Sequence, residues 1–361
     1  MSLRRTQIQH SQQTTRRPLG FSLVELMVAL VLGAVVTLGI ITMFARSQES
    51  NAVVQGQSRI QDNARYSIDF VARSLRMAGF VGCVSRNDAL RSALNGGFTN
   101  LPFIGAMNTM IQGYEGGDAA AATWTPALST LPTVGAGAID TAVIAPGTDV
   151  LVVRQASDGT RLALPQATSN GPLTVVAPAD VTRYAVGTIA VVSDCTKASL
   201  FQVSASAAAG GNLVVQHQTG GGNVPGNAVA TLPGFNEDSA VYSNEASLFR
   251  VQTTIYFVAP SAGTNNRGQS PMSLWRKIDD AAPVELIDGI EDMEVRFGID
   301  TDVDGVPNQY VNANAVTDPN RVVTVRVRFT ANSVDVVPGA GNNTTISRVF
   351  ESTVAVRNRL S

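Results

Sequence analysis

The sequence predicts an α+β protein in which one long N-terminal helix is followed by a β-rich head built from antiparallel sheets. Three observations indicate this class. Apolar residues are concentrated between positions 21 and 44, helical spacing continues to about Met77, and short β-type runs separated by Gly, Pro, Asn and Asp follow from about position 80. Only 15% of the 361 residues are charged and the formal net charge is -2, so composition indicates no bulk attraction to nucleic acid or acidic ligands.

The first segment has the residue order of a membrane anchor. Residues 1–20 contain four arginines and no acid, and residues 21–44 contain a single charge, Glu25. At about 1.5 Å per residue, a helix of this length spans about 36 Å, enough to cross a hydrocarbon core of about 30 Å. The arginines predict that the leader stays in the cytoplasm and that the chain after Phe44 emerges on the other face of the membrane.

Two other targeting signals match this segment less well. A secretory signal peptide has an apolar region of about 7–15 residues and a small-x-small cleavage site, whereas Met43 and Ala45 stand at its end here. A twin-arginine signal at Arg16 and Arg17 is interrupted by Pro18 before the apolar run begins. Glu25 is unusual in a membrane span, because burying its charge costs about 2–3 kcal/mol unless it finds a partner or snorkels to the headgroups.

The segment Gly20–Leu26, with the sequence GFSLVEL after a basic leader, resembles the type III signal of type IV prepilins and type II secretion pseudopilins. The resemblance implies that a membrane-embedded prepilin peptidase cuts between Gly20 and Phe21 and that Phe21 is then N-methylated. It also implies that Glu25 neutralises the terminal amine of a neighbouring subunit during assembly. These roles predict a cleaved leader, residues 1–20, ahead of the membrane-spanning helix half, residues 21–45.

Helical spacing persists beyond the membrane segment. Proline is absent between Phe21 and Met77, and Gly79 is a suitable helix stop. The apolar positions that recur at sevens and at threes or fours are Val53, Ile60, Ala64, Val71, Leu75 and Ala78. An amphipathic helix half is therefore expected over residues 46–79, and the resemblance implies a pilin-like fold in which it packs on a β-rich head, residues 80–361.

Alternation of apolar and polar residues predicts the strands of the head. It is clearest over residues 322–330, where Val323, Val325, Val327 and Phe329 share one face, and residues 348–357 form a suitable antiparallel partner across a long loop. Residues 91–146 lack clean periodicity and are expected to contain long surface loops. The other candidate strands are residues 150–154, 173–177, 188–193, 213–217 and 250–258.

Cys83 and Cys195 lie far apart in the head, which excludes a CxxC redox pair and a compact zinc site. In an oxidising compartment two cysteines predict one disulfide, the alternative being two buried thiols. Residues 79–83, Asp194 with Cys195, and residues 354–359 resemble PilW-type minor pilins.

Residues 300–305, with the sequence DTDVDG, resemble the opening half of a calcium loop. Carboxylates at alternate positions precede a glycine that permits a tight turn, but Val311 stands where an EF-hand has its bidentate glutamate. A short acidic connection between strands explains the same residues without a metal. The predicted ligands are Asp300, Asp302, Asp304, the carbonyl of Val306, and Asn308, and calcium is the one cofactor that the sequence suggests.

The sequence contains few residues that indicate an enzyme. It has two histidines, of which His10 lies in the predicted leader and His217 lies alone in an apparent strand, so we expect no catalytic function. The resemblance implies a minor pilin of a type IV pilus, held in the inner membrane with its head in the periplasm and assembled into the filament. Prepilin peptidase, other minor pilins, the major pilin and the inner-membrane assembly platform are the implied partners.

Two alternatives stay open. A J-type pseudopilin of a type II secretion system has a similarly large head and matches the acidic loop. A tip adhesin would use the loops of residues 91–146 and 205–248, which show no basic and aromatic cluster of the kind that nucleic-acid binding prefers.

Overall fold

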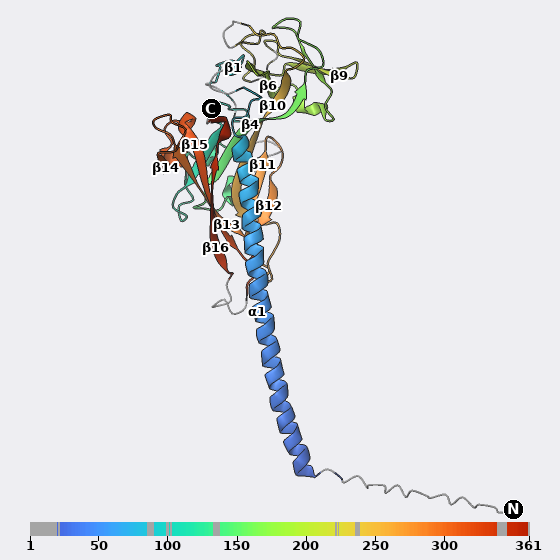
Figure 1. Cartoon of the computed structure of the whole chain (residues 1–361), viewed down its shortest axis with the longest axis vertical. Helices are drawn as coiled ribbons and strands as arrows, with labels where there is room; N and C mark the ends of the chain where they lie inside the picture. Colours follow the sequence, from blue (N-terminus) through green and yellow to red (C-terminus); the bar gives the residue numbers. More distant parts are fainter. Residues whose placement is uncertain are drawn as a thin grey trace, which may run out of the picture. The chain divides into compact units, whose positions relative to one another are not determined.

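The computed structural model confirms the α+β class (Figure 1). It describes residues 20, 22–84, 90–98, 101, 103–132, 138–220, 222, 224–234, 239–337 and 345–359. The chain divides into two compact units, residues 1–52 and residues 53–361, and helix α1 (Leu23–Met77) contributes residues to both.

The described residues of the first unit are almost entirely helical. From Leu23 to Phe44 every residue of α1 is exposed, including the large apolar ones, so none of the described residues covers this surface. The most apolar 18-residue window has a mean hydropathy of 2.6. Apolar surface on this scale requires lipid or other protein molecules around it.

In the second unit, α1 buries one stripe of small and apolar residues. Apart from the adjacent pair Val71 and Ala72, they recur at intervals of three or four, the spacing that brings side chains onto one helix face: Gly56, Ile60, Ala64, Ser67, Val71, Ala72 and Leu75. The helix ends where the sequence predicted, because Gly79 takes a left-handed backbone conformation with φ +72° that a side chain would disfavour.

The largest sheet of the described residues has nine strands and joins segments from the whole head. Its main path runs β1 (Leu90–Ser92), β7 (Ala198–Gln202), β6 (Ile189–Ser193), β10 (Ser247–Pro260), β4 (Val150–Arg161), β2 (Ile111–Gly116) and β3 (Trp124–Thr125), and β11 (Met272–Ile278) and β12 (Val284–Asp288) extend it from β10. All pairs are antiparallel except β1 with β7. The predicted antiparallel arrangement therefore holds for the sheet except at this one edge, where β1 runs parallel to β7.

The second sheet contains the predicted C-terminal hairpin. Its order is β14 (Gln309–Asn312), β13 (Ile290–Ile299), β15 (Val322–Asn332) and β16 (Ser347–Ala355). Strands β15 and β16 pair antiparallel, with Val325 opposite Val354 and Phe329 opposite Phe350. The predicted inward face of β15 is buried, which confirms the alternation.

The third sheet is a small one, with the order β5 (Leu173–Val176), β9 (Asn212–Gln216) and β8 (Ala205–Ala209). Strand β8 has the sequence ASAAA, a composition with little intrinsic strand preference. Its pairing with β9 supplies the backbone hydrogen bonds that hold it extended. Six 3₁₀ helices lie in the described connections: Leu128–Thr130, Thr141–Val143, Val181–Tyr184, Ala313–Ala315, Pro319–Arg321 and Arg357–Arg359.

Four hydrophobic clusters form the described core of the second unit, and two of them are the largest. The first packs the buried stripe of α1 against the four-stranded sheet and against parts of β4 and β10, with Leu75 and Phe329 fully buried. The second joins the three-stranded sheet to the β6–β7 hairpin around Phe201 and Tyr242. Strands β4 and β10 are long enough to contribute residues to more than one cluster, so they connect the clusters of the head.

Residues 91–146 contain a paired strand as well as the expected loops, because β2 lies inside the segment and pairs with β4. Ile111 and Tyr114 of β2 are buried. An added Cβ at Gly113 would collide with Phe297 of β13 and with Ala313. Close packing of β2 against these two residues therefore explains the glycine at this position.

Candidate functional site

The N-terminal motif lies at the start of α1. Gly20 is exposed and precedes the helix, whereas Phe21 lies outside the described residues. The Ser22 carbonyl accepts the first helical hydrogen bond from the Leu26 amide, at 3.1 Å. The predicted cleavage position is thus close to the point where regular helix begins, at Leu23.

Glu25 occupies the first turn of α1, where a carboxylate interacts favourably with the free backbone N–H groups of the helix. Its side chain is exposed, and in the described part of the chain it forms no ion pair. The residues around it are apolar. Any charge partner for Glu25 therefore lies outside the described residues of this chain.

The apolar half of α1 satisfies the length and composition of a membrane span, with none of its most apolar window buried against the rest of the chain. Such a helix anchors the protein by a single pass. In physical terms, the unit formed by residues 1–52 provides the anchor and the unit formed by residues 53–361 carries the folded core.

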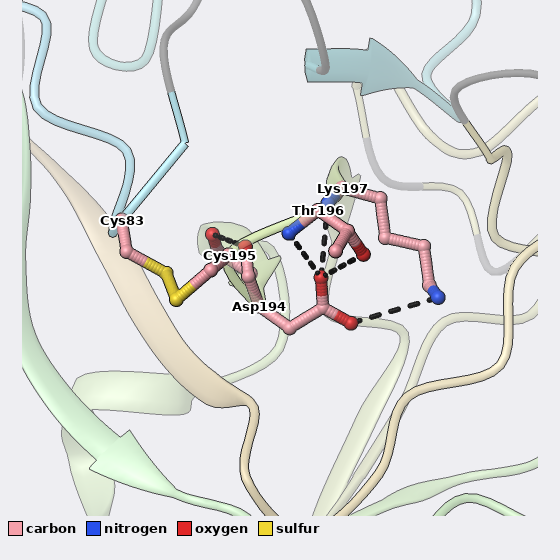
Figure 2. Close-up of a disulfide and its surroundings, with 6 residues drawn as sticks. Cys83, Asp194, Cys195, Thr196 and Lys197 are labelled. Atoms are coloured by element: carbon pink, nitrogen blue, oxygen red, sulfur yellow. Dashed lines mark hydrogen bonds and ion pairs between the residues drawn. A yellow bond between two sulfur atoms is a disulfide. The ribbon is translucent and has the colours of Figure 1, made fainter.

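A disulfide joins Cys83 and Cys195, as the sequence predicted (Figure 2). Cys83 follows the end of α1 and Cys195 lies in the turn between β6 and β7, with 4.8 Å between the two Cα atoms. The bond therefore attaches the segment that leaves the helix to a hairpin of the nine-stranded sheet.

Asp194 holds the turn that presents Cys195. Its Oδ1 atom accepts hydrogen bonds from the amide of Thr196 at 2.8 Å, the hydroxyl of Thr196 at 2.7 Å and the amide of Lys197 at 2.9 Å (Figure 2). Burial alone would raise the pKa of Asp194, but these donors and the Lys197 ammonium hold the pKa below its ordinary value. The ionised carboxylate thus closes the turn beside the disulfide.

The acidic segment after β13 forms a compact turn. Carboxylate oxygens of Asp300, Asp302 and Asp304 lie within 4.8 Å of one another. Asp300 accepts hydrogen bonds from the amides of Val303 and Gly305, at 2.6 and 2.8 Å. The carboxylates are therefore gathered as a calcium loop requires, although the Asp300 oxygens also close the turn.

The later predicted ligands fit calcium less completely. The Asn308 side-chain oxygen accepts from the Thr301 amide at 2.6 Å, and the exposed Val306 donates its amide to Asp304 at 2.8 Å. Val311 lies in β14 opposite Phe297 and supplies no carboxylate. Oxygen donors of this kind suit calcium, but only the first half of the loop matches, so calcium stays a prediction.

His217 is buried, 1% exposed, at the end of β9. Its Nε2 lies 2.9 Å from the Gly171 carbonyl, and its ring packs against Phe201 with 5.3 Å between ring centroids. Burial lowers the pKa of His217 and favours the neutral ring. These contacts fit a structural role in the second hydrophobic cluster.

Sequence reasoning missed a charged cluster on β4 and β10. Arg250 donates from Nε to Asp158 at 2.9 Å and from Nη1 to Asp279 at 3.0 Å. Both aspartates have left-handed backbones, with φ values of 56° and 44°. The signals in the sequence were the pairs Asp-Gly at 158–159 and Asp-Asp at 279–280, which do not reveal that the irregular part of β4 meets the turn after β11.

Comparison with known families agrees with the anchor and with the C-terminal part of the head. Residues 15–41 match the prokaryotic N-terminal methylation motif, which covers the signal and the beginning of α1. The class defined by fold and motif is therefore that of prepilin-like proteins, which carry an N-terminal signal and an apolar helix ahead of a β-rich head.

Within this class, residues 255–353 match the type IV pilus-assembly protein W family, PilW. The match extends from β10 to β16 and includes the four-stranded sheet. The two matches together support a PilW-type protein of the type IV pilus with a prepilin signal, as the sequence resemblance implied. Families of this kind are generally structural rather than enzymatic. No curated protein matches the chain.

Proposed function

We propose that the chain is a minor pilin of a type IV pilus, a subunit that contributes to initiation of the filament or to its tip. The observation that carries the proposal is the presence, in one chain, of the methylation motif over residues 15–41 and the PilW match over residues 255–353. The first relates to processing and assembly through an apolar helix, and the second to the type IV pilus rather than to membrane anchors in general.

The proposal divides the chain into four parts. Residues 1–20 are a cytoplasmic leader that prepilin peptidase removes, and residues 21–45 form the membrane-spanning helix half. Residues 46–79 are the amphipathic half, and residues 80–361 are the periplasmic head. Cleavage after Gly20 removes four arginines and leaves a mature chain with 22 basic and 28 acidic residues, a net charge of -6.

Processing creates the partner that Glu25 lacks. The new amine of Phe21, N-methylated in the proposal, carries a positive charge, and a neighbouring subunit's helix start is apolar apart from its own glutamate. An ion pair between Glu25 of one subunit and the amine of another replaces a lone charge in hydrocarbon, whose cost is about 2–3 kcal/mol. The same pairing sets the axial register of adjacent helices in the filament. Other minor pilins, the major pilin and the inner-membrane platform are the proposed partners.

The test is expression of the full chain with and without prepilin peptidase, followed by mass spectrometry of the N-terminus. We expect loss of about 20 residues and a methylated Phe21 only when the peptidase is present, and no cleavage of Gly20→Ala. Glu25→Ala should be cleaved normally but fail to enter filaments, with Ser22→Ala as a matched control in the same segment. An uncut chain in both strains would overturn the proposal.

The acidic loop at residues 300–308 favours a second candidate, a J-type pseudopilin of a type II secretion system. The two candidates differ in the system that the chain supports. Deletion of the gene should abolish piliation if the chain is a minor pilin, and should abolish protein secretion with pili intact if it is a pseudopilin.

A further inference from the structure

We propose that Asn95 in the head deamidates spontaneously, and that the reaction weakens the contact between residues 93–95 and residues 224–228. The chain contains two Asn-Gly pairs, Asn95 with Gly96 and Asn170 with Gly171. Asparagine is most prone to deamidation before glycine, because glycine has no side chain to obstruct attack by its own amide nitrogen. The two pairs differ in the folded structure, and the difference favours Asn95.

Asn95 lies in an exposed turn that follows β1. The Gly97 amide donates to the Leu94 carbonyl at 2.9 Å, and Gly96 takes a left-handed backbone conformation with φ +77°. Asn95 and Gly96 are both exposed, and a Cβ added at Gly97 would meet no atom within 4 Å. The turn therefore leaves open space in which the side chain and the backbone can rearrange.

The attacking nitrogen beside Asn95 is free. In the described part of the chain, the Gly96 amide donates no hydrogen bond. The Asn95 side-chain nitrogen donates to the Pro225 carbonyl at 2.7 Å, and this bond must break before the side chain can react. A single hydrogen bond on an exposed side chain slows the reaction by at most about tenfold.

The attacking nitrogen beside Asn170 is bound. The Gly171 amide donates to the Thr168 carbonyl at 2.8 Å, and the Gly171 carbonyl accepts from the Gln166 side chain at 2.8 Å. The Asn170 carbonyl accepts a further bond from the Gln218 side chain, also at 2.8 Å. Several bonds must open before the Gly171 nitrogen can attack, so Asn170 is an internal control for Asn95.

The reaction consumes only water. The Gly96 nitrogen gives up its proton and forms a bond to Cγ of Asn95, while the bond from Cγ to Nδ2 breaks and that nitrogen leaves as ammonia. Water then opens the resulting succinimide ring. Opening at Cγ gives aspartate, and opening at the backbone carbonyl carbon gives isoaspartate, whose main chain runs through the side-chain methylene. Both products gain a negative charge, and nothing is oxidised or reduced.

The products cannot keep the contact that Asn95 makes. An ionised carboxylate has no hydrogen to donate, so it would face the Pro225 carbonyl oxygen without a bond. The rest of the contact consists of the Asn95 amide on the Gly226 carbonyl at 3.0 Å and the Ala228 amide on the Ala93 carbonyl at 2.7 Å. Isoaspartate adds an atom to the main chain, which shifts these groups relative to each other and should open both bonds more often.

The first test incubates the purified full chain in detergent at physiological temperature and slightly alkaline pH. Tryptic peptides 92–154 and 162–183 carry Asn95 and Asn170 separately, and mass spectrometry with fragmentation measures each conversion. We expect Asn95 to convert at least about tenfold faster than Asn170 in the folded protein. In chain unfolded with urea the two rates should become similar, because the hydrogen bonds that protect Asn170 are then absent.

Asn95→Gln is the matched variant, because glutamine keeps the side-chain amide but must form a less favourable six-membered ring. It should leave position 95 unmodified and the rate at Asn170 unchanged. Equal rates at the two asparagines of the folded chain, or faster conversion of Asn170, would overturn the inference. Lack of conversion at Asn95 in folded protein, while the unfolded chain converts, would overturn it as well.

The second test measures the consequence by hydrogen exchange. The amides of residues 95 and 228 should exchange faster in incubated than in fresh protein, whereas those of β9 should not change. Asn95→Asp should show a smaller effect in the same direction, because it loses the side-chain donor but keeps the ordinary main chain. Unchanged exchange at both residues after conversion would refute the weakened contact. Neither test depends on the proposed function.

Discussion

Removal of the Cys83–Cys195 disulfide is expected to destabilise the head by about 5 kcal/mol. The bond closes a loop with a sequence separation of 112 residues. In the chain-entropy account, a loop of this length lowers the entropy of the unfolded chain by about 16 cal/mol/K, or about 5 kcal/mol at 25 °C. The expected loss is a large fraction of the 5–15 kcal/mol that usually separates folded from unfolded domains.

The structure also indicates whether the loss of stability arises in the folded or in the unfolded state. The disulfide attaches the end of α1 to the β6–β7 turn, and the Asp194 hydrogen bonds that close this turn do not depend on it. The folded state should therefore keep its hairpin in the Cys83→Ala, Cys195→Ala double variant, and most of the effect should arise in the unfolded state.

The assay is urea unfolding of the full chain in detergent, followed by fluorescence of Trp124 and Trp275, the two tryptophans of the sequence. The double variant should unfold at a lower urea concentration, and a reducing agent should lower the midpoint of the parent protein without affecting the variant. A change below about 1 kcal/mol would refute the reasoning, because the unfolded chain would then not behave as an open loop.

Three further predictions concern the core, a buried carboxylate and the acidic loop. Phe329→Ala should lower the free energy of unfolding by about 3–5 kcal/mol, since Phe329 is fully buried, whereas Val349→Ala on the exposed side of the same hairpin should change it by less than about 0.5 kcal/mol in urea titrations. Burial raises the pKa of Asp149 to about 7, against the opposing hydrogen bonds from two backbone amides, so the folded state holds a proton that the unfolded state releases above about pH 4. The free energy of unfolding should then fall by up to about 4 kcal/mol as the pH rises from about 4 to 7. Asp149→Asn should flatten this pH dependence. If the variant keeps the same dependence of stability on pH, other titratable groups cause it. Millimolar calcium should raise the Tm by a few degrees, and the Asp302→Asn, Asp304→Asn double variant should lose that shift. If calcium leaves the Tm of the parent protein unchanged, the segment is an acidic turn that binds no calcium.

Some strands of the head could be predicted from the local pattern of apolar and polar residues, and others could not. The β15–β16 hairpin was predictable, because alternation of buried and exposed residues reports directly on the face of a strand. Strands β2 and β8 were not, because Gly113 and the alanines of residues 205–209 have no intrinsic preference for a strand. Pairing with β4 and β9 decides their conformation, and such pairing is a property of distant segments.

The sequence by itself determined the prepilin signal, the apolar helix, the helix end at Gly79 and the class of the head, because each depends on residues close together in the chain. Tertiary structure alone decided that Arg250 joins Asp158 to Asp279. These groups are separated by up to about 120 positions, and charge carries no periodic signal along a chain. This ion-pair cluster exists because β4, β10 and the turn after β11 meet in space, which only the folded chain arranges.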